Sequence, residues 1–275
     1  MSEKFSVERF NRALSRYRRR ISNKVFFLSF PKSGRTWVRV FLNKYYFELY
    51  PFSLLNLRDS KFVNEVPRFV FTHAGALEKD TEKIVKKYAK QIKHKKKIFL
   101  IRDPRDIFVS YYYQLTKRKH IEHFKSINDL IDLNISTILR HDQLGAKKII
   151  AFLNCWINEL QGDINCLIIH YEHIKAEPEK VFYDLLMFLN DEEEVNEHAF
   201  HSALEYSNFS SMRKREENGV HKLFELSPVN KGDNDSFKTR KGEIGGFRTV
   251  LSIEDILYFD HEMLSLNKLL RNIYA

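Results

Sequence analysis

A short apolar run that ends in a polar, glycine-containing turn does most to limit how this chain can fold. Residues Val25–Phe30 read VFFLSF, and the four that follow are Pro-Lys-Ser-Gly. A largely apolar, aromatic and β-branched run of this length is typical of a strand buried in a parallel sheet. From Thr36 to Leu49 the apolar side chains recur at helical spacing. A strand, a loop and a helix in this order form the opening unit of an α/β fold.

The rest of the chain repeats this alternation of strands and helices. Further buried strands are predicted at Arg68–Thr72, Lys97–Arg102 and Cys166–His170. Helices are predicted at 79–94, 103–114, 146–160 and 177–189, with a final helix at about 253–272. We therefore predict a single α/β domain over residues 1–275, with a central parallel sheet flanked by helices and a P-loop-like phosphate site after the first strand.

Two segments lie outside this alternation. Residues 1–22 are basic and lack the apolar stretch of a signal peptide. Residues 207–248 are rich in charge, Ser, Asn and Gly, and we predict a long loop there. A loop of that length in a compact domain is typically a binding loop or a lid. We expect this one to bind the nucleotide described below.

Charge and cysteine content narrow the class of partner. The formal net charge is +10, which favours an anionic ligand. The Lys and Arg residues are spread among the α/β elements and form no nucleic-acid motif, so we expect no nucleic-acid partner. Cys155 and Cys166 have neither metal-site nor disulfide spacing, and no run approaches the ~18 apolar residues of a membrane span. These features predict a cytoplasmic protein with no membrane span.

The loop after the first strand has the composition of an anion site. Unpaired N–H groups at a helix start, together with the helix dipole, attract negative charge. Gly34 lets the backbone approach an oxygen closely, Lys32 adds a cation, and Ser33 and Thr36 add hydroxyl donors. The segment is not a Walker A loop, in which the Lys follows a second glycine. At this point the sequence is compatible with two interpretations of the loop, a phosphate-binding loop of another kind or an ordinary strand-to-helix turn.

Two later segments suit the same kind of ligand. Arg102 ends the third strand and Ser110 lies on the following helix, so both can reach the edge of the sheet where ligands bind in open α/β folds. An Arg fork beside a hydroxyl suits a terminal phosphate. Arg240, Lys241 and Gly242 form a second candidate anion clamp, although such charges are often simply solvated.

Together these three segments resemble the sulfotransferases that use 3′-phosphoadenosine 5′-phosphosulfate (PAPS), in particular the soluble, cytosolic type. In that family a Pro-Lys-Ser-Gly-Thr-Thr-Trp loop binds the 5′-phosphosulfate. An Arg-x-Pro-x-Asp segment with Val-Ser-x-Tyr binds the 3′-phosphate, and a late Arg-Lys-Gly loop completes that site. The matches occur in this order from Phe26 to Arg248. The resemblance implies transfer of a sulfuryl group to a hydroxyl or amine acceptor, with release of 3′,5′-adenosine bisphosphate (PAP) and no metal ion.

The resemblance also assigns residues to the donor site. Arg35 stands where the family has Thr, Tyr171 corresponds to a Tyr beside the adenine, and Phe209 to a Phe that stacks on it. The implied donor-binding residues are Lys32, Ser33, Gly34, Arg35, Thr36, Trp37, Arg102, Ser110, Tyr171, Phe209, Arg240, Lys241 and Gly242.

Two residues are implied to act in catalysis. His73 aligns with the His of a Lys-Thr-His segment, which is the catalytic base, while Phe71 replaces its Lys. In an in-line displacement at sulfur, His73 would take the proton of the acceptor and Lys32 would neutralise the leaving 5′-phosphate. A lone His at a strand end can also be a core residue, and that interpretation stays open.

Three other functions stay in competition. They are a P-loop-like kinase of a small molecule, a non-catalytic PAPS- or nucleotide-binding module, and a basic nucleic-acid-binding protein. The acceptor is a small molecule or a glycan, and its entrance is expected at residues 120–141 and 213–235. The sequence leaves the identity of the acceptor and the oligomeric state undecided.

Overall fold

The computed structural model describes residues 24–50, 66–117, 134–190, 194–219 and 232–274. Its centre is a four-stranded sheet of β1 (Lys24–Ser29), β2 (Arg68–Thr72), β3 (Lys96–Ile101) and β4 (Cys166–His170) in the order β2-β1-β3-β4. All neighbouring strands are parallel, with Val25 of β1 opposite Phe69 of β2 and Lys96 of β3. The predicted α/β class with a parallel sheet is confirmed.

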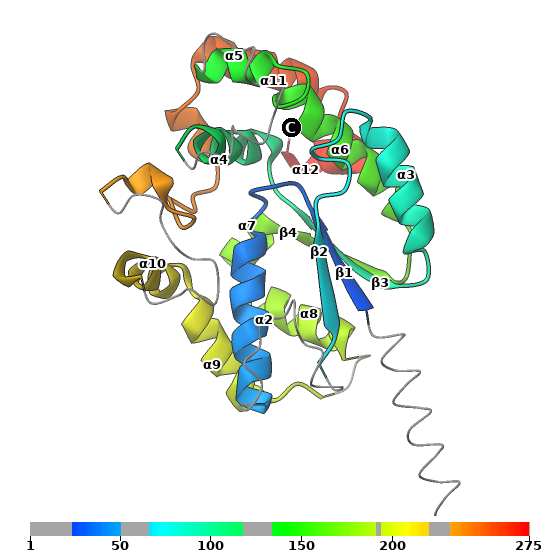
Figure 1. Ribbon diagram of the computed structural model, residues 1–275, viewed down its shortest axis with the longest axis vertical. Coiled ribbons are helices and arrows are strands. Elements are labelled where there is room, and N and C mark those ends of the chain that lie inside the picture. The colour runs from blue at the N-terminus through cyan, green and yellow to red at the C-terminus, as the bar shows by residue number, and fades with distance from the viewer. Residues whose placement is uncertain (1–23, 51–65, 118–133, 191–193, 220–231, 275) are drawn as a thin grey trace, which may run out of the picture.

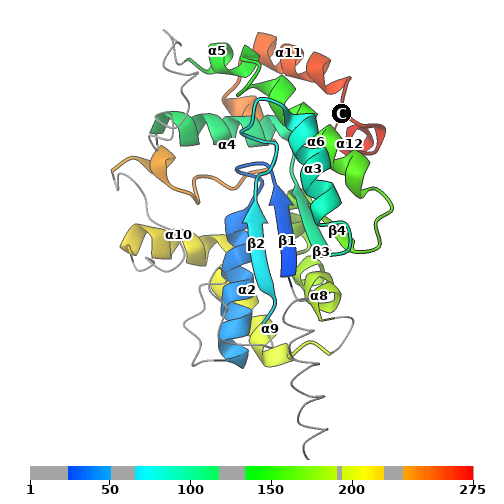
Figure 2. The same cartoon turned by 45° about the vertical axis from the view of Figure 1, so that its right-hand side comes forward.

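Helices cover both faces of the sheet (Figures 1 and 2). One face packs against α2 (Arg35–Leu49), α8 (Pro178–Leu189) and α9 (Glu197–Ser207), with an apolar core around Phe41 and Phe182. The other packs against α3 (Thr81–Gln91), α4 (Pro104–Lys117), α6 (Ala146–Leu160), α11 (Ile253–Met263) and α12 (Lys268–Tyr274), with a core around Trp156. Shorter helices are α5 (Ile135–Arg140), α7 (Tyr171–Ala176) and α10 (Phe209–Asn218), and single 3₁₀ turns are η4 (Asn234–Ser236) and η5 (Gly246–Thr249).

The order of the strands places a ligand site between β1 and β3. The chain leaves β1 into α2 on one face of the sheet and leaves β3 into α4 on the other. The two connections therefore diverge above the carboxyl ends of neighbouring strands, which is where ligands bind in open α/β sheets. The loops 30–34 and 102–103 both begin at this point.

The expected long loop at 207–248 is wrong over its first part. Residues Phe209–Asn218 form α10, which lies beside α9 in Figure 2. Asn208 caps its first turn by accepting a hydrogen bond from the Ser211 N–H, and Gly219 ends it with a φ of 69°. Residues 220–231, within this predicted loop, lie outside the described residues.

The expected single C-terminal helix at about 253–272 is also wrong, since it is two helices. Asn154 of α6 makes two hydrogen bonds to the chain between them. Its side chain donates to the carbonyl of Ser265 at 2.8 Å and accepts from the N–H of Asn267 at 2.7 Å. The Asn267 side chain then accepts from the Leu269 N–H at the start of α12. The Ser265 carbonyl and the N–H groups of Asn267 and Leu269 thus form hydrogen bonds with side chains and not with the helix backbone.

Candidate active site

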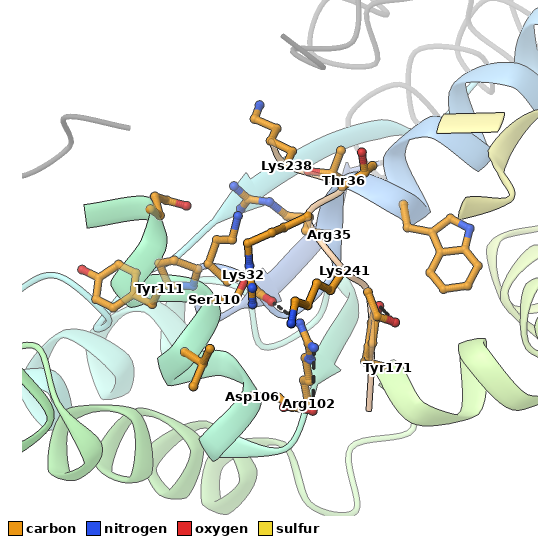
Figure 3. Close-up of a pocket in the computed structure, with 18 of the residues that line it drawn as sticks. Lys32, Arg35, Thr36, Arg102, Asp106, Ser110, Tyr111, Tyr171, Lys238 and Lys241 are labelled. Atoms are coloured by element: carbon orange, nitrogen blue, oxygen red, sulfur yellow. Dashed lines mark hydrogen bonds and ion pairs between the residues drawn. The ribbon is translucent and has the colours of Figure 1, made fainter. Parts of the chain in front are cut away.

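A cavity of about 510 Å³ opens above the carboxyl ends of β1 and β3. It is lined by residues from β1–α2, the end of β2, α4, α7, α10 and the segment 238–246 (Figure 3). The structure brings every residue implied by the sequence to this cavity except Ser33. These lining residues are Lys32, Gly34, Arg35, Thr36, Trp37, His73, Arg102, Ser110, Tyr171, Phe209, Arg240, Lys241 and Gly242.

The loop between β1 and α2 has an unusual backbone. Lys32 has a φ of 73°, and among the described residues it is the sole non-glycine with a positive φ. Such a conformation costs about 1–3 kcal/mol and is concentrated at functional sites. Gly34 has a φ of 99°, and a Cβ there would lie 2.5 Å from the Tyr171 ring. The close approach of loop and ring therefore requires glycine.

The start of α2 is suited to an anion. Unlike α3, α9, α10 and α11, this helix has no side-chain cap, and its first turn contains no acidic residue. No acidic side chain in this first turn therefore offsets the positive end of the helix dipole. Ser33 does not add its hydroxyl, which is buried and donates back to the carbonyl of Phe30 at 3.0 Å.

Arg102 lies above the carboxyl end of β3, where the connections from β1 and β3 diverge, and several groups contact its side chain. Its guanidinium donates to the carbonyl oxygens of Lys32 at 3.4 Å and Glu243 at 2.9 Å, and lies 4.3 Å from the centre of the Tyr171 ring. The Asp106 carboxylate is 3.7 Å away. The Nε of Arg102 is buried without a protein partner. Figure 3 shows Arg102, Tyr171 and Lys241 together on one side of the cavity, with Tyr111 on the other.

Two buried carboxylates attach the late segment 238–246 to the domain. Asp106 of α4 accepts hydrogen bonds from the N–H groups of Gly245 at 2.8 Å and Phe247 at 3.0 Å. Glu216 of α10 accepts from the N–H groups of Lys238 and Thr239 at 2.8 and 2.9 Å, and from the Thr239 hydroxyl at 2.7 Å. Residues 240–242, the Arg-Lys-Gly sequence, thus lie at the cavity between two segments that are fixed by hydrogen bonds to these carboxylates.

Three aromatic rings form another wall of the cavity. Trp37 and Tyr171 meet edge to face with centroids 6.1 Å apart. Phe209 packs so closely on Gly242 that a Cβ there would lie 2.5 Å from the ring. The Tyr171 hydroxyl also donates to the Gly242 carbonyl at 3.3 Å. Lys175 lies over both Trp37 and Phe209. All three residues line the cavity, which gives one of its walls an aromatic character.

His73 follows β2 and reaches the same cavity. Its Nδ1 lies 2.6 Å from the carbonyl oxygen of Ser29. A carbonyl only accepts, so Nδ1 carries the proton and Nε2 presents a lone pair. Burial, and next the nearby Arg35 guanidinium, lower the pKa of His73 from 6.5 to about 3. The imidazole is therefore neutral at physiological pH, with a pKa well below the working pH at which a general base is most effective.

Arg35 and Phe71 both depart from the family pattern, and the structure brings them together. The Arg35 guanidinium lies 5.7 Å from the Phe71 ring centre and donates to the carbonyl of Thr72 at 3.5 Å. Arg39, one turn further along α2, lies 5.2 Å from the same ring. Helix α2 thus places a guanidinium group near His73, where β2 has Phe71 in place of the Lys of the family pattern.

Sequence reasoning missed several residues that shape this site. The sequence contains no motif that marks Lys175, Glu216 or Lys238 as part of a site. Glu216 lies in a run of charged residues in α10, and no sequence signal distinguishes it from its exposed neighbour Glu217. The predicted acceptor entrance at 120–141 and 213–235 falls mostly on 118–133 and 220–231, outside the described residues.

The described residues contain neither a membrane-spanning helix nor a cluster of metal ligands. None of the helices found there has the length and apolarity needed to cross a membrane. Within the same residues, no group of three or more His, Cys, Asp or Glu side chains is placed to hold a metal ion.

Solved structures with related folds include two enzymes crystallised with PAP. A mouse sulfotransferase in complex with PAP matches with a TM-score of 0.61 at 17% identity, over 92% of this chain and 90% of that one. A retinol dehydratase in complex with androsterone and inactive cofactor PAP matches with a TM-score of 0.57 at 14% identity, over 88% and 80%. At these identities the likeness establishes a shared fold.

Sequence comparisons extend this result to the family. A curated relative, the amine sulfotransferase of Oryctolagus cuniculus, is 22% identical over 258 residues, which cover 86% of this chain and 78% of the relative. The family model of the sulfotransferase domain matches residues 22–269, from just before β1 into α12. The chain therefore belongs to the sulfotransferase-domain family.

Proposed function

We propose that this protein transfers a sulfuryl group from PAPS to a hydroxyl or amine acceptor, with His73 as general base and PAP as the second product. The observation that carries the proposal is the meeting of three distant segments, 31–37, 102–110 and 240–242, with His73 around one cavity. An anion site at a helix start, an arginine fork and a neutral imidazole are the groups that this reaction requires.

The residues of the cavity fit a nucleotide with two separate anionic groups. Arg102 has a buried Nε without a protein partner, and Ser110, Arg240 and Lys241 line the same cavity. They suit a 3′-phosphate because charge-assisted, bidentate hydrogen bonds recognise such a group. The capless start of α2 with Lys32 suits the 5′-phosphosulfate. The wall of Trp37, Tyr171 and Phe209 suits the adenine.

The proton transfer follows from the tautomer of His73. With Nδ1–H donated to Ser29, Nε2 is the atom that removes the proton from the acceptor oxygen or nitrogen as that atom attacks sulfur. Lys32 and the N–H groups at the start of α2 stabilise the charge that develops on the leaving phosphate. Positioning and electrostatics supply most of the acceleration in group transfers of this kind.

Two competing functions make different demands. A small-molecule kinase needs a metal ion to bridge the phosphates and a Walker loop to hold them, and residues 31–37 depart from that loop. A non-catalytic nucleotide-binding module has no use for a neutral imidazole at the end of β2. The cavity lining includes both His73 and Lys32, which favours the enzyme.

A screen of acceptors with ³⁵S-labelled PAPS tests the proposal. Phenols, aliphatic alcohols, sugars and amines would be incubated with the protein in the presence of excess EDTA. We expect a labelled product and one equivalent of PAP for at least one acceptor class. A parallel assay would replace PAPS and EDTA with γ-³²P-labelled ATP and Mg²⁺. Phosphate transfer in that assay, without any sulfated product in the first, would replace the proposal with a kinase. Tight binding of PAP with no transfer to any class would favour the binding module.

A further inference from the structure

Exposed lysines gather along the outer face of α3 and on the turn that follows this helix. α3 connects the carboxyl end of β2 to the amino end of β3, so it runs from the cavity end of the sheet to the opposite end. The exposed basic side chains of α3 and the turn are Lys83, Lys86, Lys87, Lys90, Lys93 and His94. The exposed side chains of α3 include one carboxylate, that of Glu82. This stretch of the surface is therefore strongly positive.

Most of these lysines have no acidic partner. Lys86 forms an i, i+4 ion pair with Glu82. Four others make no hydrogen bond or ion pair through their ammonium groups with any residue that the structure describes: Lys83, Lys87, Lys90 and Lys93. The first three recur at i, i+4 and i+7, which places them on one face of the helix. Their charges add together because no carboxylate separates them along that face.

A buried lysine holds the end of this surface in place. Lys97 is 1% exposed, and its ammonium donates to the carbonyl oxygens of Ile92 at 3.2 Å, Lys93 at 2.9 Å and Lys95 at 2.8 Å. The same ammonium lies 2.8 Å from the carboxylate of Asp163, in the loop before β4. Lys97 therefore fastens the turn after α3 to the loop 161–165, and it satisfies carbonyl groups at the negative end of the helix dipole.

An exposed apolar side chain lies at the same end. Ile164 is 91% exposed, more than any other large hydrophobic side chain among the described residues. It lines a depression of about 560 Å³ together with Lys90, Lys93 and His94, with Glu159 as the carboxylate that has no ion pair there. Lysines around an exposed isoleucine are typical of a surface that meets a membrane interface. The exposed side chains of α3 include neither Arg nor an aromatic ring, the groups that most often bind nucleic acid.

We infer that the outer face of α3, the turn 92–95 and Ile164 bind the surface of a membrane that contains anionic phospholipids. The lysines lie among the charged headgroups, and Ile164 enters the apolar boundary beneath them. α3 lies on one side of the molecule and α10, which lines the cavity through Phe209, on the other (Figures 1 and 2). The cavity thus stays open to solvent when the protein is bound. No residue of the cavity takes part, so the inference is independent of the proposed function.

Co-sedimentation of the full chain with vesicles tests the inference. The vesicles would be phosphatidylcholine alone or phosphatidylcholine with about 30% phosphatidylserine. At about 0.1 M salt we expect the partition coefficient to be at least about tenfold higher for the anionic vesicles, and this preference should be lost at about 0.5 M salt. Lys87→Gln/Lys90→Gln should lower binding to the anionic vesicles at least about tenfold. Ile164→Ser should lower it at least about threefold.

Matched variants control for charge, apolarity and folding. Lys180→Gln/Lys214→Gln removes the same charge from exposed positions on α8 and α10, and Ile253→Ser removes an isoleucine that is 77% exposed on α11. Both should bind anionic vesicles like the wild type, and circular dichroism would verify that every variant is folded.

Three results would overturn the inference. They are equal binding to the two kinds of vesicle, equal losses in the two double lysine variants, and unchanged binding in Ile164→Ser. A duplex oligonucleotide would be tested in parallel. Binding to the duplex that Lys87→Gln/Lys90→Gln abolishes, without any binding to vesicles, would replace the membrane with a nucleic acid.

Discussion

The Asp106 carboxylate accepts a hydrogen bond from the backbone N–H of Gly245 at 2.8 Å, across 139 positions of the sequence. The same carboxylate lies 3.7 Å from the guanidinium of Arg102. One buried side chain therefore orients an arginine at the end of β3 and fixes the late segment that adds Arg240 and Lys241. Burial raises the pKa of Asp106, while Arg102 and the N–H of Gly245 oppose that shift.

The second attachment of this segment, at Glu216, can be tested by Glu216→Gln. The buried carboxylate accepts three hydrogen bonds, and an amide would turn a donor toward at least one of the same donors. We expect a loss of about 1–3 kcal/mol in the free energy of unfolding and a weaker affinity for PAP. Urea unfolding and calorimetry measure the two effects. Glu179→Gln, at an exposed site on α8, should change neither. Unchanged stability in Glu216→Gln would show that this attachment is dispensable.

The role of His73 is tested by its removal. His73→Ala should lower the rate of sulfuryl transfer by about 10²–10⁴-fold, the range for loss of a general base. The affinity for PAP should stay within a few-fold, because His73 follows β2 on the acceptor side. Turnover and PAP affinity would be measured on the same preparation. A rate within a few-fold of the wild type would exclude His73 from the mechanism.

The pH dependence of transfer should reflect the low pKa of His73. The imidazole is a base only when it is neutral, and burial lowers its pKa from 6.5 to about 3, with Arg35 as the next cause. At saturating PAPS, kcat/KM for the acceptor should therefore begin to fall only well below pH 6.5. Arg35→Gln removes a positive neighbour, so it should raise the pKa and move this acidic limb to higher pH. An acidic limb at or above pH 6.5 in both proteins would contradict the assignment.

The glycine of the first loop provides a steric test. In Gly34→Ala, the new Cβ would lie 2.5 Å from the Tyr171 ring, on a backbone with a φ of 99°. Left-handed geometry alone costs an alanine roughly 1–2 kcal/mol. We expect PAP affinity to fall at least about tenfold. Gly162→Ala is the control, because it has a φ of 78° but nothing within 4 Å of its Cβ. Equal PAP affinity in Gly34→Ala and the wild type would contradict this description of the loop.

The elements that could be predicted from sequence are those whose burial leaves a periodic pattern. β4 and α6 have the predicted bounds because Ile169 and Trp156, like their apolar neighbours, are packed in the core. α10 is held by its caps and by the Glu216 carboxylate, and its sequence FSSMRKREEN shows no apolar stripe. Asn208 and Gly219 are local signals for the ends of this helix, whereas the hydrogen bonds of Glu216 to residues 238–239 leave no local pattern.

In the candidate site too, some features could be predicted from the sequence and others could not. The loop motifs at 31–37 and 240–242 are local, and the topology of the sheet brings them to one cavity. The inward turn of the Ser33 hydroxyl and the stacking of Arg35 on Phe71 depend on packing between β1, α2 and β2. Such contacts join residues that are separated in the sequence, so they become visible only in three dimensions.

Recognition of the 3′-phosphate is the central claim, and calorimetry with PAP and AMP on the wild type and Arg102→Ala tests it most directly. AMP lacks the 3′-phosphate, so it leaves the buried cations at Arg102 without their anion. We predict that the wild type binds PAP at least about 100-fold more tightly than AMP, about 2.7 kcal/mol. Arg102→Ala should erase most of this difference by weakening PAP alone. Equal affinity of the wild type for PAP and AMP would contradict the 3′-phosphate site and, with it, the use of PAPS.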